Sequence, residues 1–286
     1  IIDNPDAFSD YPSMPDTGAG PRQYLIISTA QLIPAFQTLA DHRQSVAGGE
    51  FNTHIEDVAN IDANVTGIDL AEKIRNYITQ SYLTYGTEYV LLGGDADLSG
   101  TPAIPVRGAW SEVSGYTDDN IPTDLYYGAL DGTWNSDGDH LWGESNDGPD
   151  GTDIDWDSEV YVGRISVDNV TEANKHISKI ISFETQTDYP KNALMAGQYL
   201  QGDPETWAGD RLDWVEQAMT GFTTNHLYDR DETWSSYDIT REINNNQFLT
   251  VNVLTHSNPL KDMKMSAADI YDLQNSMPFL VYSQSC

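Results

Sequence analysis

The sequence predicts an α/β protein with mostly parallel sheets, and three observations lead to this fold class. Short apolar runs rich in β-branched residues alternate with amphipathic stretches of helical spacing. One series of alternating strands and helices precedes Tyr189-Pro190 and a second series follows it, so we expect this dipeptide to separate two halves. With 286 residues, 39% of them hydrophobic, the chain can bury a core in one large domain or two modest ones.

The first half is expected to span residues 22–190, after an irregular arm over 1–21 that is rich in Pro, Asp, Gly and Ser. Asp69 and Gly86 flank an amphipathic stretch as N-cap and C-terminal stop, and Thr171 is the expected cap of the last helix. The predicted strands are 23–28, 50–58, 88–95 and 159–165, and the predicted helices are 33–45, 69–85 and 171–187.

Residues 96–158 interrupt this pattern with a high density of Asp, Gly, Asn and Trp and little periodicity. The segment is therefore predicted to be a long acidic loop. A loop of that length inside a compact domain usually has a function.

The second half, residues 191–286, repeats the α/β alternation. Its predicted strands are 192–200, 224–228, 248–256 and 277–286, and its predicted helices are 208–220, 240–246 and 266–275.

The charge balance limits the classes of partner. The chain has 45 acidic and 14 basic residues, a net charge of −31, which disfavours nucleic acid and anionic membranes as partners. It is compatible with calcium, a salt-rich medium or basic substrates, and equally with a solvated acidic surface. No GxxxxGK[ST], GxGxxG, CxxC or HExxH pattern occurs, and no apolar run is long enough for a membrane span.

Two apolar runs end in complementary chemical groups. One leads into His256, and the other leads into Cys286, the only cysteine. If the runs are neighbouring parallel strands, their carboxyl ends share one edge, where an imidazole can take the proton of a thiol. The pattern favours acyl transfer, although a lone cysteine is often a small core residue and a lone histidine a structural one.

The segments around these residues resemble the gingipain family of cysteine peptidases, within the caspase-like clan. The clan's pattern is an apolar strand ending in His and a small residue, followed by an apolar strand ending in a small residue and Cys, here 251–257 and 279–286. Three further segments are similar to gingipain-like proteins: Tyr89-Val-Leu-Leu-Gly-Gly-Asp95, the stretch 122–132, and Glu159-Val-Tyr-Val-Gly-Arg-Ile165.

The resemblance implies two caspase-like three-layer αβα subdomains, the second incomplete at its C-terminus, and a cysteine endopeptidase that cleaves after Arg or Lys. Cys286 corresponds to the nucleophile and His256 to the general base and acid, with no cofactor in catalysis. The backbone N–H groups of Ser257 and Cys286 correspond to the oxyanion hole. Ser257 stands where the family usually has Gly.

Two further roles follow from the same resemblance. Gln201, or alternatively Asp203, falls where the family has an acidic residue that orients the histidine. Asp213, with Asp210 beside it, falls near the acidic residue that binds the basic side chain of the substrate. These two aspartates can equally serve to complement a helix N-terminus.

The loop that begins at Thr133 has oxygen-bearing side chains at its first, third and fifth positions, Gly138 at the sixth and Glu144 at the twelfth, which is the spacing of a calcium loop. We therefore expect structural Ca²⁺, with a solvated acidic loop as the alternative. The candidate ligands are Asp131, Asn135, Asp137, Asp139, Glu144, Asp147, Asp153 and Asp155.

Together these features predict a secreted or cell-surface endopeptidase that acts on proteins or peptides with basic residues. The start at Ile1 predicts a mature or trimmed form. Because family members continue beyond the nucleophile strand, we expect a further C-terminal segment of the same precursor, either cleaved off as a separate partner chain or continuous with Cys286. The alternatives are a non-catalytic, calcium-loaded caspase-like module for assembly or adhesion, and a related transpeptidase.

Overall fold

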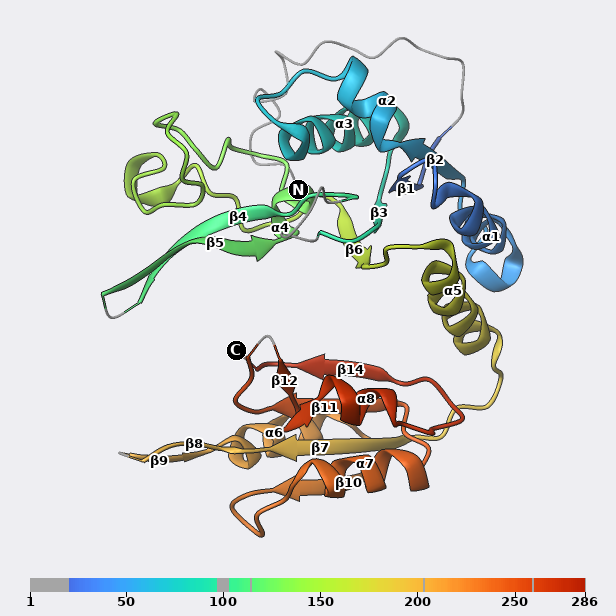
Figure 1. Cartoon of the computed structure of the whole chain (residues 1–286), viewed down its shortest axis with the longest axis vertical. Helices are drawn as coiled ribbons and strands as arrows, with labels where there is room; N and C mark the ends of the chain where they lie inside the picture. Colours follow the sequence, from blue (N-terminus) through green and yellow to red (C-terminus); the bar gives the residue numbers. More distant parts are fainter. Residues whose placement is uncertain (1–20, 97–102, 114, 203, 259, 286) are drawn as a thin grey trace. The chain divides into compact units, whose positions relative to one another are not determined.

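The computed structural model describes residues 21–96, 103–113, 115–202, 204–258 and 260–285. The chain divides into two compact units, residues 1–184 and 185–286 (Figure 1). The division falls shortly before Tyr189-Pro190, where the sequence predicted a boundary.

The first unit is built on a parallel four-stranded sheet with the order β2-β1-β3-β6. Its strands are β1 (Tyr24–Ser28), β2 (Thr53–Asp57), β3 (Tyr89–Gly93) and β6 (Tyr161–Ile165). In the inner strand β1, the consecutive side chains from Leu25 to Ile27 are fully buried. Both faces of this sheet are therefore covered, as is usual for parallel sheets.

Helices form a layer on each face of this sheet. The helices α1 (Ile33–Gln44) and α5 (Val170–Thr185) pack on one face, and α2 (Val58–Asn64), α3 (Leu70–Tyr85) and α4 (Leu125–Gly128) pack on the other. A short 3₁₀ turn, η2 (Val46–Gly48), follows α1. The three layers confirm the predicted α/β class.

The ends of α3 follow the sequence signals. The Asp69 side chain accepts a hydrogen bond from the Glu72 backbone N–H at 2.9 Å, and Gly86 ends the helix with φ of 67°. The predicted cap of α5 was wrong. Thr171 lies inside that helix, and the Asn169 side chain accepts from the Glu172 N–H instead, at 3.1 Å.

Within residues 96–158, the described residues contain more regular structure than predicted. They contain an antiparallel hairpin of β4 (Arg107–Val113) and β5 (Tyr116–Thr123), the helix α4, and a 3₁₀ turn η3 (Pro149–Gly151). The hairpin had no sequence signal because nearly every residue of β5 is exposed, so its apolar residues do not alternate. Arg107 anchors it by a two-pronged ion pair with Asp69, at 2.8 and 2.9 Å.

The second unit repeats the topology of the first. Its parallel sheet has the order β10-β7-β11-β14, with strands β7 (Asn192–Gly197), β10 (Thr223–Tyr228), β11 (Thr250–Leu254) and β14 (Leu280–Ser283). In both units the first strand lies between the second and the third, and the fourth lies beyond the third.

Helices again cover both faces. The helix α6 (Ala208–Ala218) packs on the Met195 face of the sheet, whereas α7 (Ser236–Asn245) packs on the opposite face, with α8 (Ala267–Tyr271) beside it. A capping box of Ser235 with Asp238 starts α7 earlier than the predicted residue 240.

Two small hairpins complete the unit: β8 (Tyr199–Gly202) with β9 (Glu205–Trp207), and β12 (Lys261–Asp262) with β13 (Met265–Ser266). The sequence had merged β7 and the start of β8 into one strand. Among the described residues, none of the helices combines the length and hydropathy that crossing a membrane requires.

Candidate active site

The carboxyl ends of β7 and β11 form a topological switch point. The connection from β7 leads to β10 on one side, and the connection from β10 returns to β11 on the other. Ligands of open α/β sheets usually bind in the crevice at such a point. An open pocket of about 250 Å³ lies there, lined by Gln198, His256, Ser257, Asn258, Lys261 and Lys264.

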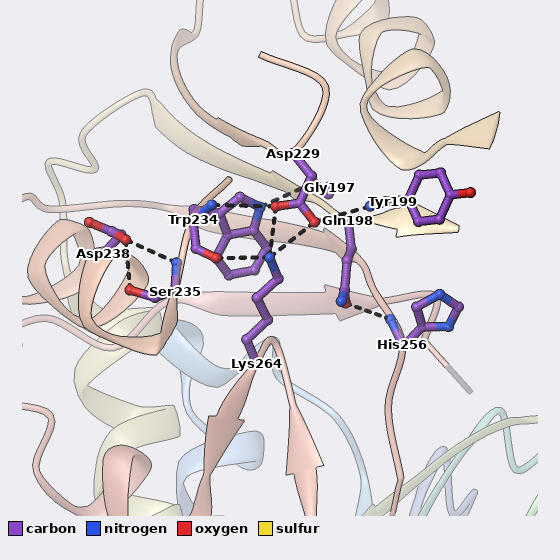
Figure 2. A network of polar contacts seen from close by, with 9 residues as sticks. All are labelled: Gly197, Gln198, Tyr199, Asp229, Trp234, Ser235, Asp238, His256 and Lys264. Carbon is purple, nitrogen blue, oxygen red and sulfur yellow. Dashed lines mark hydrogen bonds and ion pairs between the residues drawn. The ribbon is translucent and has the colours of Figure 1, made fainter. Parts of the chain in front are cut away.

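His256 is held to the end of β7 through its backbone. Its N–H donates to Oε1 of Gln198 at 3.0 Å (Figure 2). The backbone N–H of Gln198 in turn donates to the Leu254 carbonyl at 3.0 Å, which extends the pairing of β7 with β11 past both strand ends. The imidazole is exposed at the pocket.

The neighbouring strand β14 brings the residue before Cys286 close to the residue before His256. Oγ of Ser285 accepts the Thr255 N–H at 3.2 Å and lies 2.9 Å from the Thr255 hydroxyl. The Gln284 N–H donates to the Val253 carbonyl at 2.9 Å, so the parallel pairing continues beyond the strand. Cys286 itself lies outside the described residues.

A carboxylate that the sequence did not single out joins these segments. Oδ1 of Asp262 accepts the Ser257 hydroxyl at 2.5 Å, the Met263 N–H at 2.8 Å and the Ser283 hydroxyl at 3.4 Å. Burial alone would raise the pKa of Asp262, but hydrogen bonds from Ser257, Met263, Ser283 and Ser285 outweigh it and lower that pKa. A charged Asp262 therefore fixes the segment after His256 to the strand before Cys286.

The backbone N–H of Ser257 is one of the two predicted donors of the oxyanion hole. The Ser257 hydroxyl donates to Asp262, and within the described part of the chain the Ser257 N–H donates no hydrogen bond. Such an N–H is available to donate a hydrogen bond to an oxygen that develops negative charge.

Of the two predicted orienting residues, the structure describes only Gln201. Gln201 is exposed in the β8–β9 hairpin, opposite Thr206, and Asp203 lies outside the described residues. The side chain that reaches the His256 backbone is that of Gln198. The sequence missed it because the predicted strand ran to Leu200, whereas β7 ends at Gly197 and Gln198 is the first residue after it.

The predicted specificity residues are paired within the chain. Nη1 of Arg230 lies 2.5 Å from Asp210 and 2.7 Å from Asp213, and Nη2 donates to Asp213 at 3.0 Å. The hydrogen bond with Asp213 is the main reason that the pKa of Arg230 is raised, although partial burial opposes it. A substrate cation would meet carboxylates that already have a partner.

In the acidic loop, Asp137, Asp139 and Glu144 bring one carboxylate oxygen each within 4.8 Å of one another. Desolvation, followed by the charges of Asp139, Asp137 and Asp147, raises the pKa of Glu144. Asn135 supports the turn by accepting the Gly138 N–H at 3.0 Å and donating to the Asp139 carbonyl at 2.9 Å. Oxygen donors gathered in this way fit Ca²⁺.

Asp147, another predicted ligand, organises the loop from inside. It is fully buried. One of its oxygens accepts the Ser136 N–H at 2.8 Å, and the other accepts the N–H groups of Gly143 and Glu144 at 3.0 and 2.9 Å. Its lone pairs are thereby directed at the backbone.

The other predicted ligands also have contacts within the loop region. Asp153 accepts the backbone N–H of Thr133 at 3.1 Å as well as its hydroxyl. Asp155 accepts the Asp157 N–H at 2.9 Å, and the Asp131 carbonyl accepts from Arg75 at 2.9 Å.

Comparisons with known proteins give one family. The family model for peptidase family C25 matches residues 18–286. A search of curated proteins finds no match.

Two solved structures are similar to the chain. One is the complex of the pro- and mature domains of RgpB from Porphyromonas gingivalis, with a TM-score of 0.65 and 17% identity over 92% of this chain and 55% of that one. The other is the Arg-specific cysteine proteinase gingipain R (RgpB), with a TM-score of 0.63 and 18% identity over 96% of this chain and 56% of that one. The likeness confirms the predicted α/β fold with parallel sheets. The chain spans little more than half the length of both structures.

Proposed function

The chain belongs to peptidase family C25, the gingipain family, and on that basis we propose that it is a cysteine endopeptidase with Cys286 as nucleophile and His256 as general base and acid. The observation that carries the proposal is the contact between Thr255 and Ser285, the residues that directly precede the two catalytic candidates. The contact supports the proposal because consecutive Cα atoms lie only about 3.8 Å apart.

The proposed reaction is acyl transfer through a covalent intermediate. His256 takes the thiol proton, the Cys286 sulfur attacks the peptide carbonyl carbon, and the N–H groups of Ser257 and Cys286 stabilise the oxyanion. The C–N bond then breaks, and the imidazolium gives its proton to the departing amine. A water molecule, deprotonated by His256, hydrolyses the thioester and regenerates the thiol.

The positioning of His256 is assigned to Gln198 in place of Gln201, because the Gln198 side chain accepts from the His256 backbone. Asp203 remains the alternative for a charged partner. A neutral amide orients the histidine segment but does not stabilise the imidazolium as a carboxylate would.

A preference for Arg or Lys is proposed through Asp213, with Asp210 beside it. The proposal is supported by the contacts of both carboxylates with Arg230, because a site that binds one guanidinium has the charge and spacing for another. A basic substrate side chain would have to compete with Arg230 for them.

Ca²⁺ is proposed as a structural ion of the acidic loop, held by Asp137, Asp139 and Glu144. The ion would cancel repulsion among these carboxylates and takes no part in the reaction. The inward-turned Asp147 then supports the backbone of the site.

The partners and location are proposed on the same family basis. The outer strand β14 leaves Leu280, Val281 and Tyr282 at 60%, 47% and 59% exposed. An exposed edge strand of this kind is a template for another polypeptide, for which we propose a further segment of the same precursor. We also propose a secreted or cell-surface location, which fractionation of the source cells would test.

Substitution of the nucleophile tests the activity. We expect Cys286→Ala to abolish hydrolysis of peptides with a single Arg or Lys while leaving the thermal unfolding curve unchanged. Undiminished turnover in that variant would contradict the mechanism, and a native protein that never cleaves would favour the non-catalytic module. Product analysis with an added amine separates a transpeptidase, since the acyl group is then joined to the amine.

A further inference from the structure

A largely buried ion pair lies at the His256 pocket, which Lys264 helps to line. Nζ of Lys264 donates to the two carboxylate oxygens of Asp229 at 2.7 and 3.0 Å and to the Trp234 carbonyl at 2.8 Å (Figure 2). It also lies 4.1 Å from the centre of the Trp234 ring. The side chains are only 17% and 9% exposed, so the charges are largely withdrawn from water.

The contacts of this pair converge on the end of β7. Asp229 accepts the Tyr199 N–H at 3.1 Å, and its own N–H donates to the Gly197 carbonyl at 3.0 Å. Nε1 of Trp234 donates to the same carbonyl at 3.1 Å. The Asp229 carboxylate therefore holds Tyr199, while the Asp229 backbone and the Trp234 indole hold Gly197, and these are the residues on either side of Gln198.

Gln198 is the last link before the proposed base. Two hydrogen bonds fix its backbone. Its N–H donates to the Leu254 carbonyl at 3.0 Å, and its carbonyl accepts from the Ala208 N–H at 2.9 Å. Its side chain accepts from the His256 N–H. Lys264 is thus connected to His256 in three steps: its ion pair with Asp229, the hydrogen bonds of Asp229 to the chain neighbours of Gln198, and the hydrogen bond between Gln198 and His256.

The backbone at Lys264 is strained. Met263 and Lys264 form the two-residue turn between β12 and β13, with φ of 55° and 59°. Turns of this type favour Asn and Gly, because the left-handed region is costly for other residues. Buried Met263 and the three Lys264 contacts hold the turn in this conformation.

Stability alone gives little reason for such a pair, since a buried ion pair is often no better than an apolar pair of similar size. We propose that Lys264 is a positioning residue of the active site, which acts through Asp229 and Gln198 to hold His256 in place. The inference rests on the proposed peptidase function. A general base must lie within hydrogen-bond reach of its proton, and small displacements are costly to the rate.

Single removal of Lys264 would leave Asp229 charged and buried, so the main test uses the double variant Lys264→Met with Asp229→Asn, which removes both charges. We expect its kcat on an Arg- or Lys-containing peptide to fall about 10- to 100-fold, with KM changed less than about twofold. The conservative Lys264→Arg should recover most of the activity. Lys191→Met removes an exposed lysine of the same unit and serves as the control.

Rates are normalised to the folded protein, measured by near-UV circular dichroism, so that loss of fold is not counted as loss of catalysis. A double variant with the kcat of the native protein, or a loss no larger than the unfolded fraction, overturns the positioning role. If the native protein itself has no activity that Cys286→Ala removes, the proposed function fails and the positioning role fails with it. If that activity exists and the double variant retains it, only the positioning role fails.

Discussion

The two units share one strand order but present different chemistry at the carboxyl ends of their sheets. In the first unit, a pocket of about 620 Å³ at this edge is lined by Asp57, Asp62, Asp95 and Asp168, among other residues. In the second, His256 projects at the same edge beside Lys264. Each sheet therefore has a pocket at the carboxyl ends of its strands, and the side chains that line the two pockets give them different chemistry.

The carboxylates of the first unit have structural partners. Asp57 accepts the Ala59 N–H at 3.0 Å at the start of α2, and Asp62 pairs with Lys73 at 2.8 Å. The polar groups of the second unit converge instead on the histidine and cysteine segments. We infer that acidic residues serve mainly stability in the first unit and that catalysis belongs to the second.

The proposed division of roles between the two units is tested most strongly by substituting the residue at the same topological position in each unit. His256 follows the third strand of the second sheet, and Asp95 follows the third strand of the first. We expect His256→Ala to lower kcat at least about 10³-fold, because the general base is lost, and Asp95→Asn to leave kcat near the native value. Steady-state peptidase assays on both variants decide this; equal losses would refute the division of roles.

The next largest effect concerns the acidic loop of the first unit. If Ca²⁺ binds there, calcium at about 100 times its Kd should stabilise the native protein by about 2.7 kcal/mol. Asp137→Asn combined with Asp139→Asn should remove this gain, whereas Asp119→Asn on the exposed hairpin should not. Thermal unfolding with and without calcium measures it, and a native protein insensitive to calcium would rule the site out.

A smaller effect is expected at Arg230. Its replacement by Ser frees Asp210 and Asp213, so KM for peptides with Arg should fall, by about 10-fold for a gain of about 1.4 kcal/mol. Peptides with a neutral residue at that position should be unaffected. A fall in KM for both kinds of peptide would argue against a role of these carboxylates in specificity.

The smallest effect is the pH dependence of Glu56 in the first unit. Burial alone would raise its pKa, but hydrogen bonds from His54, Tyr77 and Asn60 outweigh it and lower the pKa to about 2 from 4.5. Because the folded-state pKa is the lower one, the stabilisation is present above about pH 4.5 and is lost as the pH falls toward about 2.

Glu56→Gln should therefore cost about 1–2 kcal/mol at pH 6, after discounting for solvent screening, and less at pH 3. Urea unfolding at the two pH values measures the difference. Exposed Glu88→Gln is the control, and a Glu56→Gln cost that does not shrink in acid contradicts the assignment.

The sequence predicted the α/β class and most buried strands, because a strand covered on both faces is a continuous apolar run. It failed where tertiary contacts replace a hydrophobic core, as in the β4–β5 hairpin that Arg107 anchors to Asp69. It also could not find Asp262 or the pairing of Lys264 with Asp229, since these contacts join residues whose spacing carries no pattern.

Small errors at strand ends had larger consequences for the site. The predicted strand ran past Gly197 and so contained Gln198, whose side chain accepts the His256 N–H; Gln201 and Asp203 were considered instead, on the family resemblance. The placement of Arg230 against Asp210 and Asp213 was likewise invisible, because it depends on how the end of β10 lies against α6.

The most direct test of the central claim is the alkylation rate of Cys286, the only cysteine, followed by mass mapping after brief exposure to iodoacetamide at neutral pH. If His256 activates the thiol, His256→Ala should slow alkylation about 10-fold or more, and Asp95→Asn should leave it unchanged. Equal alkylation rates in the native protein and in His256→Ala would contradict a thiol–imidazole pair in the second unit.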